Sequence, residues 1–247
     1  GNFQELDSVI APIDTTDDQL EIKALCEEHL LKNKNSIIAL YISGSIALQR
    51  HSLDYGNIST LVELFVDARK WNIVEFLALK ILAQQDDKYV LRVLADCYDK
   101  QGREDDKFAL YERLVRVDYD ETTLTQTIAE RYMAKGNVEK ALYYYKKAMQ
   151  RFIHVLDFSA VKDVWAMFLE KIPEEVGYLL GTAQRVAVKL QGERAILLLN
   201  QLYDSLRHKN DWDTCIQVLK AILNLDAKNQ IARDRLVDCY RNKYATH

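Results

Sequence analysis

Thr122–Gln150 reads TTLTQTIAERYMAKGNVEKALYYYKKAMQ, which contains two amphipathic patterns on either side of Gly136. Each pattern repeats apolar residues at the three- and four-residue spacing that forms one face of an α-helix. A glycine directly after the first pattern is typical of a helix end, because glycine adopts the left-handed conformation there without a steric penalty. The stretch therefore predicts two antiparallel helices joined by a tight turn.

The same pattern occurs 34 residues earlier, where Lys88–Asp99 aligns with Thr122–Met133. The matched pairs are Ala95 with Ala129, Tyr98 with Tyr132, Gly102 with Gly136, and Tyr111 with Tyr145. The same offset relates Leu202 to Leu236 further along the chain. A fixed period of this length is the signature of stacked helix pairs, so we expect a repeat architecture.

The period and the residue types resemble the tetratricopeptide repeat (TPR) family. With Thr122 as position 1, Ala129 is the family's small residue at position 8 and Tyr132 is its aromatic at position 11. Gly136 is the turn glycine, whereas Ile153 stands where the family usually has proline. The resemblance implies an all-α fold, a TPR-like α-solenoid of about thirteen helices in antiparallel pairs.

The domain organisation follows from the period. Residues 1–16 are expected to form an irregular N-terminal lead, and residues 17–247 a single α-solenoid. A longer irregular helix pair is expected in residues 156–195, with Pro173 in the first turn of its second helix. The repeats are best defined at 88–121, 122–155, 196–229 and 230–247.

The helix boundaries follow from the apolar period and from end signals. The first helix is expected to begin at a capping box, Thr16-x-x-Gln19. Trp71 and Trp212 fall at equivalent places, each at the start of the second helix of a pair. The expected helices are 16–32, 36–50, 57–69, 71–84, 88–101, 104–117, 122–135, 138–152, 156–171, 174–191, 193–208, 212–224 and 230–243.

The composition excludes several classes of protein. The 247 residues include 8 Gly and 2 Pro, too few for the turns of a β-sandwich or for a glycine-rich phosphate loop. No apolar run approaches the roughly 18–20 residues that span a bilayer, and no secretory signal opens the chain. The four scattered cysteines are expected to be buried free thiols, which together with these absences favours a cytoplasmic protein. Because the chain lacks an initiating Met and its last helix has no partner, we expect a piece of a longer polypeptide.

The sequence holds no motif for catalysis, for a cofactor or for a metal ion. Its paired acidic residues fall at expected helix starts or loops, where capping and the helix dipole account for them. We therefore expect a protein that is not an enzyme, with no catalytic residues, no bound cofactor and no metal site.

Two surface patterns are candidates for partner binding. Position 9 of the repeats faces the inner groove in the TPR family, and a row of carboxylates there would favour a basic or helical partner segment. These residues are Glu63, Asp96, Glu130, Asp204 and Asp238. Lys146, Lys147 and Arg151 form a candidate basic strip in the most positive repeat. Both patterns also fit an ordinary solvated helix face, and the mildly acidic chain is not expected to bind nucleic acid directly.

A narrower resemblance covers several stretches that are similar to the N-terminal helical-repeat region of long bacterial Gre-type transcription elongation factors. These stretches are Asn35–Tyr41, Lys70–Glu75, Glu193–Leu199 and Asp213–Lys220. The resemblance implies a non-catalytic protein–protein interaction module of a factor that acts on RNA polymerase. Val161–Glu170 resembles a half-a-TPR repeat, which leaves open a scaffold for an RNA-processing or other multiprotein complex.

Overall fold

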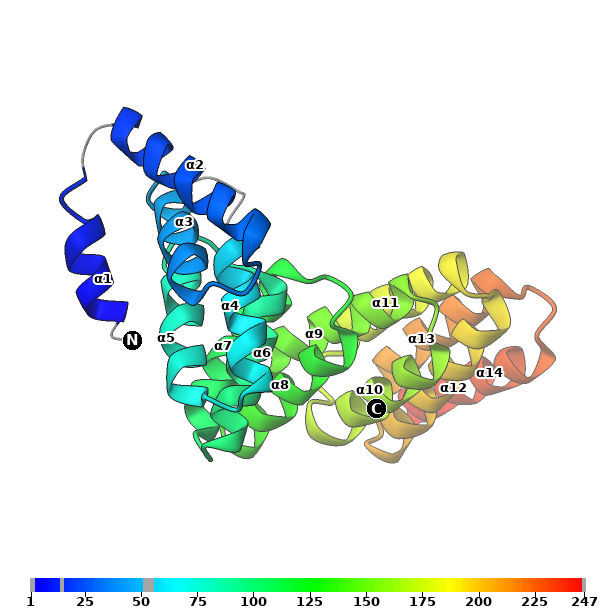
Figure 1. Ribbon diagram of the computed structural model, residues 1–247. Helices are drawn as coiled ribbons and strands as arrows, with labels where there is room; N and C mark the ends of the chain where they lie inside the picture. Colours follow the sequence, from blue (N-terminus) through cyan, green and yellow to red (C-terminus); the bar gives the residue numbers. More distant parts are fainter. Residues whose placement is uncertain (1–2, 14–15, 51–55, 246–247) are drawn as a thin grey trace. The chain divides into compact units, whose positions relative to one another are not determined.

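The computed structural model describes residues 3–13, 16–50 and 56–245. Over these residues the chain forms fourteen α-helices and no strand, which confirms the all-α expectation (Figure 1). The helices are α1 (Phe3–Ile10), α2 (Thr16–Lys32), α3 (Ile37–Gln49), α4 (Gly56–Asp67), α5 (Trp71–Leu82), α6 (Lys88–Lys100), α7 (Glu104–Val117), α8 (Thr122–Ala134), α9 (Val138–His154), α10 (Phe158–Lys171), α11 (Val176–Lys189), α12 (Gly192–His208), α13 (Trp212–Leu225) and α14 (Gln230–Ala245). Helices α2 to α14 correspond to the thirteen expected from the sequence.

The chain divides into two compact units, residues 1–121 and 122–247. Unit 1 contains α1 to α7, and each helix from α2 onward packs against the next one along the chain. Unit 2 contains α8 to α14 and has its own core around Trp165 and Phe168. The expectation that residues 17–247 form one continuous array stays a prediction.

Five helix pairs turn in the same way. At Gly102 the residue φ is +72°, and at Gly136 it is +74°, as the sequence predicts for the residue after the first helix of a pair. The following amide donates to the carbonyl five residues back, from Arg103 to Tyr98 and from Asn137 to Tyr132, each at 2.9 Å. This is the Schellman arrangement, which satisfies carbonyls left without partners at a helix end.

The other three turns use residues that carry a side chain. They are Arg69, Leu156 and Asn210, with φ values of 54°, 62° and 57°. Their hydrogen bonds match those at the two glycines, for example from the Asp157 amide to the Phe152 carbonyl at 2.9 Å. The left-handed turn therefore belongs to the architecture and not to glycine alone.

The residue after each of these turns precedes the second helix of the pair. Asn137, Asp157 and Asp211 are true caps, since their side-chain oxygens accept from the amide three residues later at 3.0–3.1 Å. Lys70 and Arg103 stand in the same place without a side-chain cap. Each turn thus ends one helix and begins the next within two residues.

Small residues set the closest helix approaches. Ala95 and Ala129 are 1% and 0% exposed, as expected for the small position of the repeat. A tighter approach lies in unit 1, where Gly44 of α3 faces Ile58 of α4. A Cβ placed on Gly44 would lie 2.8 Å from the Ile58 backbone nitrogen and would overlap the Ile58 side chain. Glycine is therefore required at this helix crossing.

Two expectations at the N-terminus are wrong. Residues 3–10 of the expected irregular lead form α1, whose Phe3 and Ile10 are buried against unit 1. Helix α2 begins at Thr16 itself, and the Gln19 side chain donates to the Ile13 carbonyl at 2.7 Å. Gln19 thus bonds to the chain before the helix instead of closing a capping box with Thr16.

The irregular segment 156–195 also differs from expectation. Pro173 lies in a turn that precedes α11, because this helix begins only at Val176. Helix α10 packs mainly on α9, and α11 packs mainly on α12; the two also meet through Phe168 and Tyr178, whose ring centres lie 5.3 Å apart. The turn at Leu156 explains this, since it joins α9 to α10 in the way that Gly136 joins α8 to α9.

We expect Gly44→Ala to lower the free energy of unfolding by about 3 kcal/mol, because the added methyl overlaps backbone and side-chain atoms of Ile58. Gly177→Ala in α11 is the control, since a Cβ there meets nothing within 4 Å and should stabilise its helix by up to about 1 kcal/mol. Urea denaturation of both variants measures the difference, and equal midpoints would contradict the close approach at Gly44.

We expect Leu156→Gly to raise the free energy of unfolding by about 0.5–1 kcal/mol. Leu156 is 56% exposed and its left-handed φ is costly for a residue with a Cβ. Val155→Gly is the matched control, because Val155 has φ −84° and gains no such relief. If the two glycine variants destabilise the chain equally in thermal melts, strain at Leu156 is not relieved.

Candidate protein-interaction surface

The five acidic residues at position 9 are all exposed. Glu63 and Asp96 lie on α4 and α6 of unit 1. Glu130, Asp204 and Asp238 lie on α8, α12 and α14 of unit 2. Each is the first helix of an expected pair, and a single groove lined by all five stays a prediction.

Their charges are compensated differently in the two units. In unit 1, Asp96 forms no ion pair with any residue that the structure describes. In unit 2, Asp204 lies 4.0 Å from the Arg235 guanidinium, and Asp238 lies 3.5 Å from that of Arg241. The position-9 carboxylates therefore keep more uncompensated negative charge in unit 1 than at the end of unit 2.

A cleft of about 260 Å³ opens beside Asp96. It is lined by residues of α4 and α6 and by Trp71, the first residue of α5. The lining residues are Val66, Trp71, Val93, Asp96, Asp99 and Lys100. The Lys107 ammonium lies 2.6 Å from the Asp99 carboxylate and compensates its charge. Asp96 is therefore the carboxylate that remains available at this cleft.

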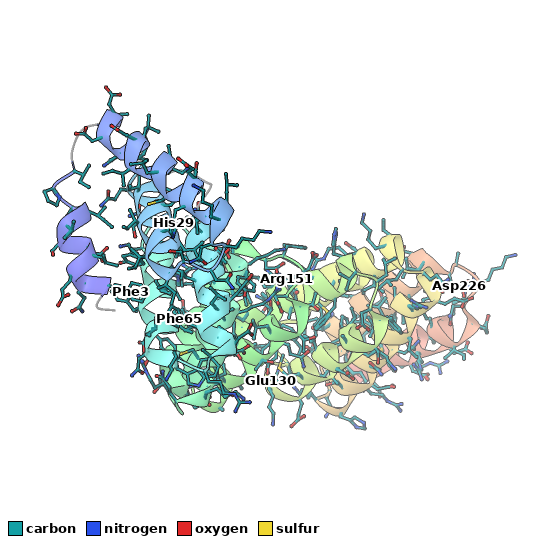
Figure 2. The ribbon with its side chains drawn as sticks, viewed as in Figure 1. Phe3, His29, Phe65, Glu130, Arg151 and Asp226 are labelled. Carbon is teal, nitrogen blue, oxygen red and sulfur yellow. The ribbon has the colours of Figure 1, made fainter. Side chains whose placement is uncertain are left out.

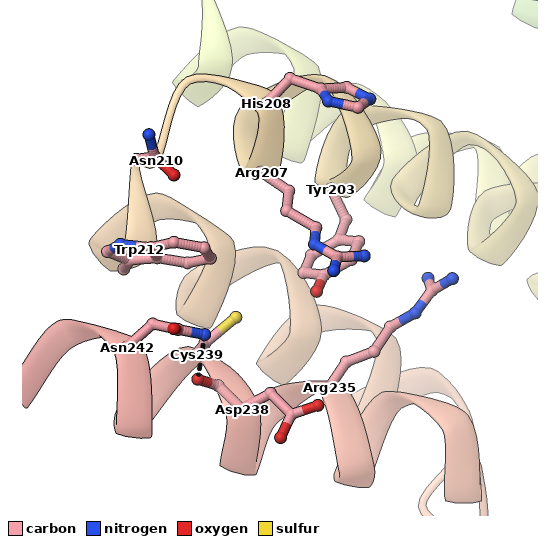
Figure 3. A pocket seen from close by; sticks show the side chains of 9 residues that line it. All are labelled: Tyr203, Arg207, His208, Asn210, Trp212, Arg235, Asp238, Cys239 and Asn242. Carbon is pink, nitrogen blue, oxygen red and sulfur yellow. Dashed lines mark hydrogen bonds between the residues drawn. The ribbon is translucent and has the colours of Figure 1, made fainter. Parts of the chain in front are cut away.

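A larger cleft of about 710 Å³ lies between α12, the start of α13 and α14 (Figure 3). Its lining residues are Tyr203, Arg207, His208, Asn210, Trp212, Arg235, Asp238, Cys239 and Asn242. Arg207 and Arg235 enter from opposite helices toward Tyr203 (Figure 3). The Arg235 guanidinium lies 4.8 Å from the centre of the Tyr203 ring and donates to Asn200 at 2.8 Å.

The two clefts occupy the same place in the repeat. Counting each pair from position 1, both are lined by positions 12 and 17 of one pair and by positions 6, 9 and 13 of the next. In unit 1 these are Val66, Trp71, Val93, Asp96 and Lys100; in unit 2 they are Arg207, Trp212, Arg235, Asp238 and Asn242. The equivalence of Trp71 and Trp212 was readable in the sequence, but the clefts were not, because they depend on how the next helix packs.

The candidate basic strip does not exist as a strip. Arg151 is 4% exposed and donates to the Thr125 hydroxyl at 2.7 Å, because its position on α9 faces α8. Lys146 pairs with Glu175 at 2.8 Å, so its charge is compensated within unit 2. Lys147 lies 4.9 Å from the centre of the Tyr143 ring. The expectation of an exposed basic surface that includes Arg151 is therefore wrong.

All four cysteines are free, as expected, and three of them are buried. Burial raises the pKa of Cys215 to about 12, with a further contribution from the neighbouring Cys239. Burial likewise raises the pKa of Tyr203, beside the same cysteines, to about 12. A thiol with so high a pKa is protonated at neutral pH and is a poor nucleophile.

Two kinds of feature are absent from the ranges that the structure describes. Among those residues, no three His, Cys, Asp or Glu side chains are grouped so that they could hold a metal ion. Within the same ranges, no helix combines the length and the apolar character that a membrane span requires.

Comparison with known sequences gives two relatives. No family model matches the chain. Over 99% of its length it is 39% identical to a GreA-associated domains protein of Treponema pallidum, and over 98% it is 32% identical to transcription elongation factor GreA of Borreliella burgdorferi. The chain spans 37% and 27% of the length of these relatives. The resemblance to Gre-type proteins is thus confirmed over nearly the whole length of the chain.

Two solved structures are distantly similar. One is BtubC of P. vanneervenii, with a TM-score of 0.31 and 15% identity over 94% of this chain and 93% of that one. The other is the C-terminal part of a TPR repeat-containing protein from Cytophaga hutchinsonii, with a TM-score of 0.28 and 15% identity over 94% of this chain and 98% of that one.

We expect the stability of unit 2 to fall at alkaline pH in a way that depends on Cys215. Its pKa is about 12 in the folded chain and about 8.5 in an unfolded one, so only the unfolded state releases the proton between these values. The free energy of unfolding therefore declines with rising pH, by up to about 1.4 kcal/mol per pH unit from this thiol. Cys215→Ser should show a shallower decline in urea titrations from pH 8 to 11, and parallel curves would contradict the assignment.

Proposed function

We propose that this chain is a non-catalytic protein–protein interaction module of a Gre-type transcription elongation factor, and that it docks its parent protein on RNA polymerase. The observation that carries the proposal is 39% identity over 99% of the chain to a GreA-associated domains protein. The second relative, 32% identical over nearly the same span, is named as a transcription elongation factor. Because the chain spans only 37% of one relative and 27% of the other, we assign it the docking step alone.

The two equivalent clefts are the proposed contact points. Each exposes part of a tryptophan, Trp71 or Trp212, with charged side chains on its rim. Tryptophan, tyrosine and arginine are the residues on which binding energy concentrates at protein interfaces. A cleft with this lining suits a protruding side chain of a protein partner better than a small metabolite.

The charge at the unit 1 cleft points to a basic partner segment. Asp96 is exposed at the rim, and Glu63 is exposed at the equivalent position of the preceding pair. A lysine or arginine inserted beside Trp71 would meet the Asp96 carboxylate, and its alkyl chain would pack on the indole. Such a contact makes association sensitive to salt.

The alternative of an RNA-processing scaffold rests on Val161–Glu170. This stretch forms most of α10, and Trp165 at its centre is fully buried in the core of unit 2. Its residue pattern thus has a packing role, and no surface feature of the stretch favours that alternative.

The proposal is tested by binding of purified bacterial RNA polymerase to the immobilised chain at increasing salt. We expect saturable binding that weakens with salt, and at least tenfold weaker binding by the double variant Asp96→Lys, Glu130→Lys. The control is Asp120→Lys, Asp163→Lys, which changes the charge equally at exposed residues outside position 9, one in each unit. The control should bind as the wild type does.

The outcomes separate the parts of the proposal. Absence of polymerase binding by the intact chain, with recovery of an RNA-processing complex instead, would overturn the docking function. An equal loss of polymerase binding in both double variants would show that binding depends on the net charge of the chain and not on the residues at position 9.

A further inference from the structure

Helix α1 lies against a surface formed by α3, α4 and α5 of unit 1. Phe3 at its start (Figure 2) is 8% exposed. Its ring centre lies 4.5 Å from that of Tyr41. The ring centres of Phe65 and Phe76 lie 6.0 and 6.2 Å from that of Phe3. Aromatic side chains from three helices therefore enclose one phenylalanine, which is the geometry of an anchor in a pocket.

One turn further along α1, the surface binds a carboxylate. Asp7 accepts a hydrogen bond from the Tyr41 hydroxyl at 2.7 Å and another from the Lys80 ammonium. Lys80 also donates to the Tyr41 hydroxyl at 2.9 Å and lies 4.7 Å from the centre of that ring. Two donors from α3 and α5 thus converge on a single carboxylate, in a setting that is only partly open to solvent.

The contacts of α1 follow one stripe of the helix. Phe3, Asp7 and Ile10 are spaced by four and three residues, and Ile10 is 2% exposed. Val9, off this stripe, is 66% exposed. This is how an amphipathic helix lies in a groove of another protein, with anchors at i, i+4 and i+7.

The surface that α1 covers is built on helices that also pack on one another. We define the α1 seat as Tyr41, Phe65, Phe76 and Lys80. Helices α3, α4 and α5 pack on one another through fully buried residues such as Ile46 and Leu77. By contrast, α1 has eight residues, below the roughly 12–15 that make an isolated helix even marginal in water. Helix α1 is therefore ordered by the seat, whereas the seat is held by its own helices.

We propose that the α1 seat is a docking site for an amphipathic helix of a partner protein, and that α1 covers it as an intramolecular competitor. The partner helix carries an aromatic residue, a carboxylate four residues later and an aliphatic residue three after that. Because α1 is tethered, its effective concentration at the seat is high, and a partner must displace it. This inference does not depend on the proposed docking to RNA polymerase.

The test uses the full chain and a fluorescent peptide with the sequence of residues 1–13, GNFQELDSVIAPI, as the probe. In the double variant Phe3→Ala, Asp7→Ala the tethered helix loses two of its anchors and leaves the seat open. We expect this variant to bind the peptide at least tenfold more tightly than the wild type does, as measured by fluorescence polarisation. A chain with Val9→Ala, changed on the exposed side of α1, should behave as the wild type.

Specificity is tested on the probe. A peptide with asparagine in place of Asp7 should bind the double variant at least tenfold more weakly, because it offers Lys80 no charge. Absence of saturable binding to a double variant with wild-type helix content, or equal binding of both peptides, would overturn the proposal.

A second measurement needs no variant. Amide hydrogen exchange of the wild-type chain should be at least a hundredfold faster in residues 6–10 than in the buried part of α3, because α1 leaves the seat while unit 1 stays folded. Exchange of α1 and α3 at one common rate would contradict a seat that opens independently.

Discussion

The left-handed residue between paired helices is the constraint on which the rest of the structure depends. It occurs at five turns, and each time it ends one helix two residues before the next one begins. In two of the pairs, the second helix begins with a tryptophan, Trp71 or Trp212. The turn thereby places the indole beside the following helix, which is where both clefts open. The geometry that folds the chain also positions its candidate binding sites.

Local signals in the sequence predicted much of the fold, and the failures share a cause. The turns at Gly102 and Gly136 could be predicted because glycine is the residue that adopts a left-handed φ without a steric penalty. Leu156 carries no such signal, so the break between two helices was predicted there but its left-handed turn was not, and α10 begins at Phe158 instead of at 156. Helix α1 was missed because contacts of Phe3 and Asp7 with distant helices order it, and a local pattern cannot show these. Arg151 was assigned to a surface by its charge, although its place on α9 directs it toward Thr125.

The sequence predicted where the acidic residues of the candidate surface lie in the repeat, but not which residues surround them. Repeat counting placed Asp96 and Asp238 at equivalent exposed sites, and the structure has each at the rim of a cleft. The residues around them differ between the two clefts. Position 6 is Val93 in one and Arg235 in the other, and position 12 is Val66 in one and Arg207 in the other. Position 13 is Lys100 in one and Asn242 in the other. One scaffold therefore presents two sites at the same place in the repeat that differ in size and charge, which suits a partner that is recognised at more than one point. The α1 seat adds a third site of another kind, since the chain itself already fills it.

The measurement that tests the docking function most directly is site-specific photocrosslinking. A photoreactive phenylalanine derivative placed at Trp71 or at Trp212 should crosslink to RNA polymerase subunits, because both clefts are contact points in this account. The same group at Val188, which is 83% exposed on α11 and lies outside both clefts, serves as the reference. Crosslinks at the two tryptophans well above those at Val188 are the predicted result. Equal yields at all three positions, or none to polymerase, would contradict it.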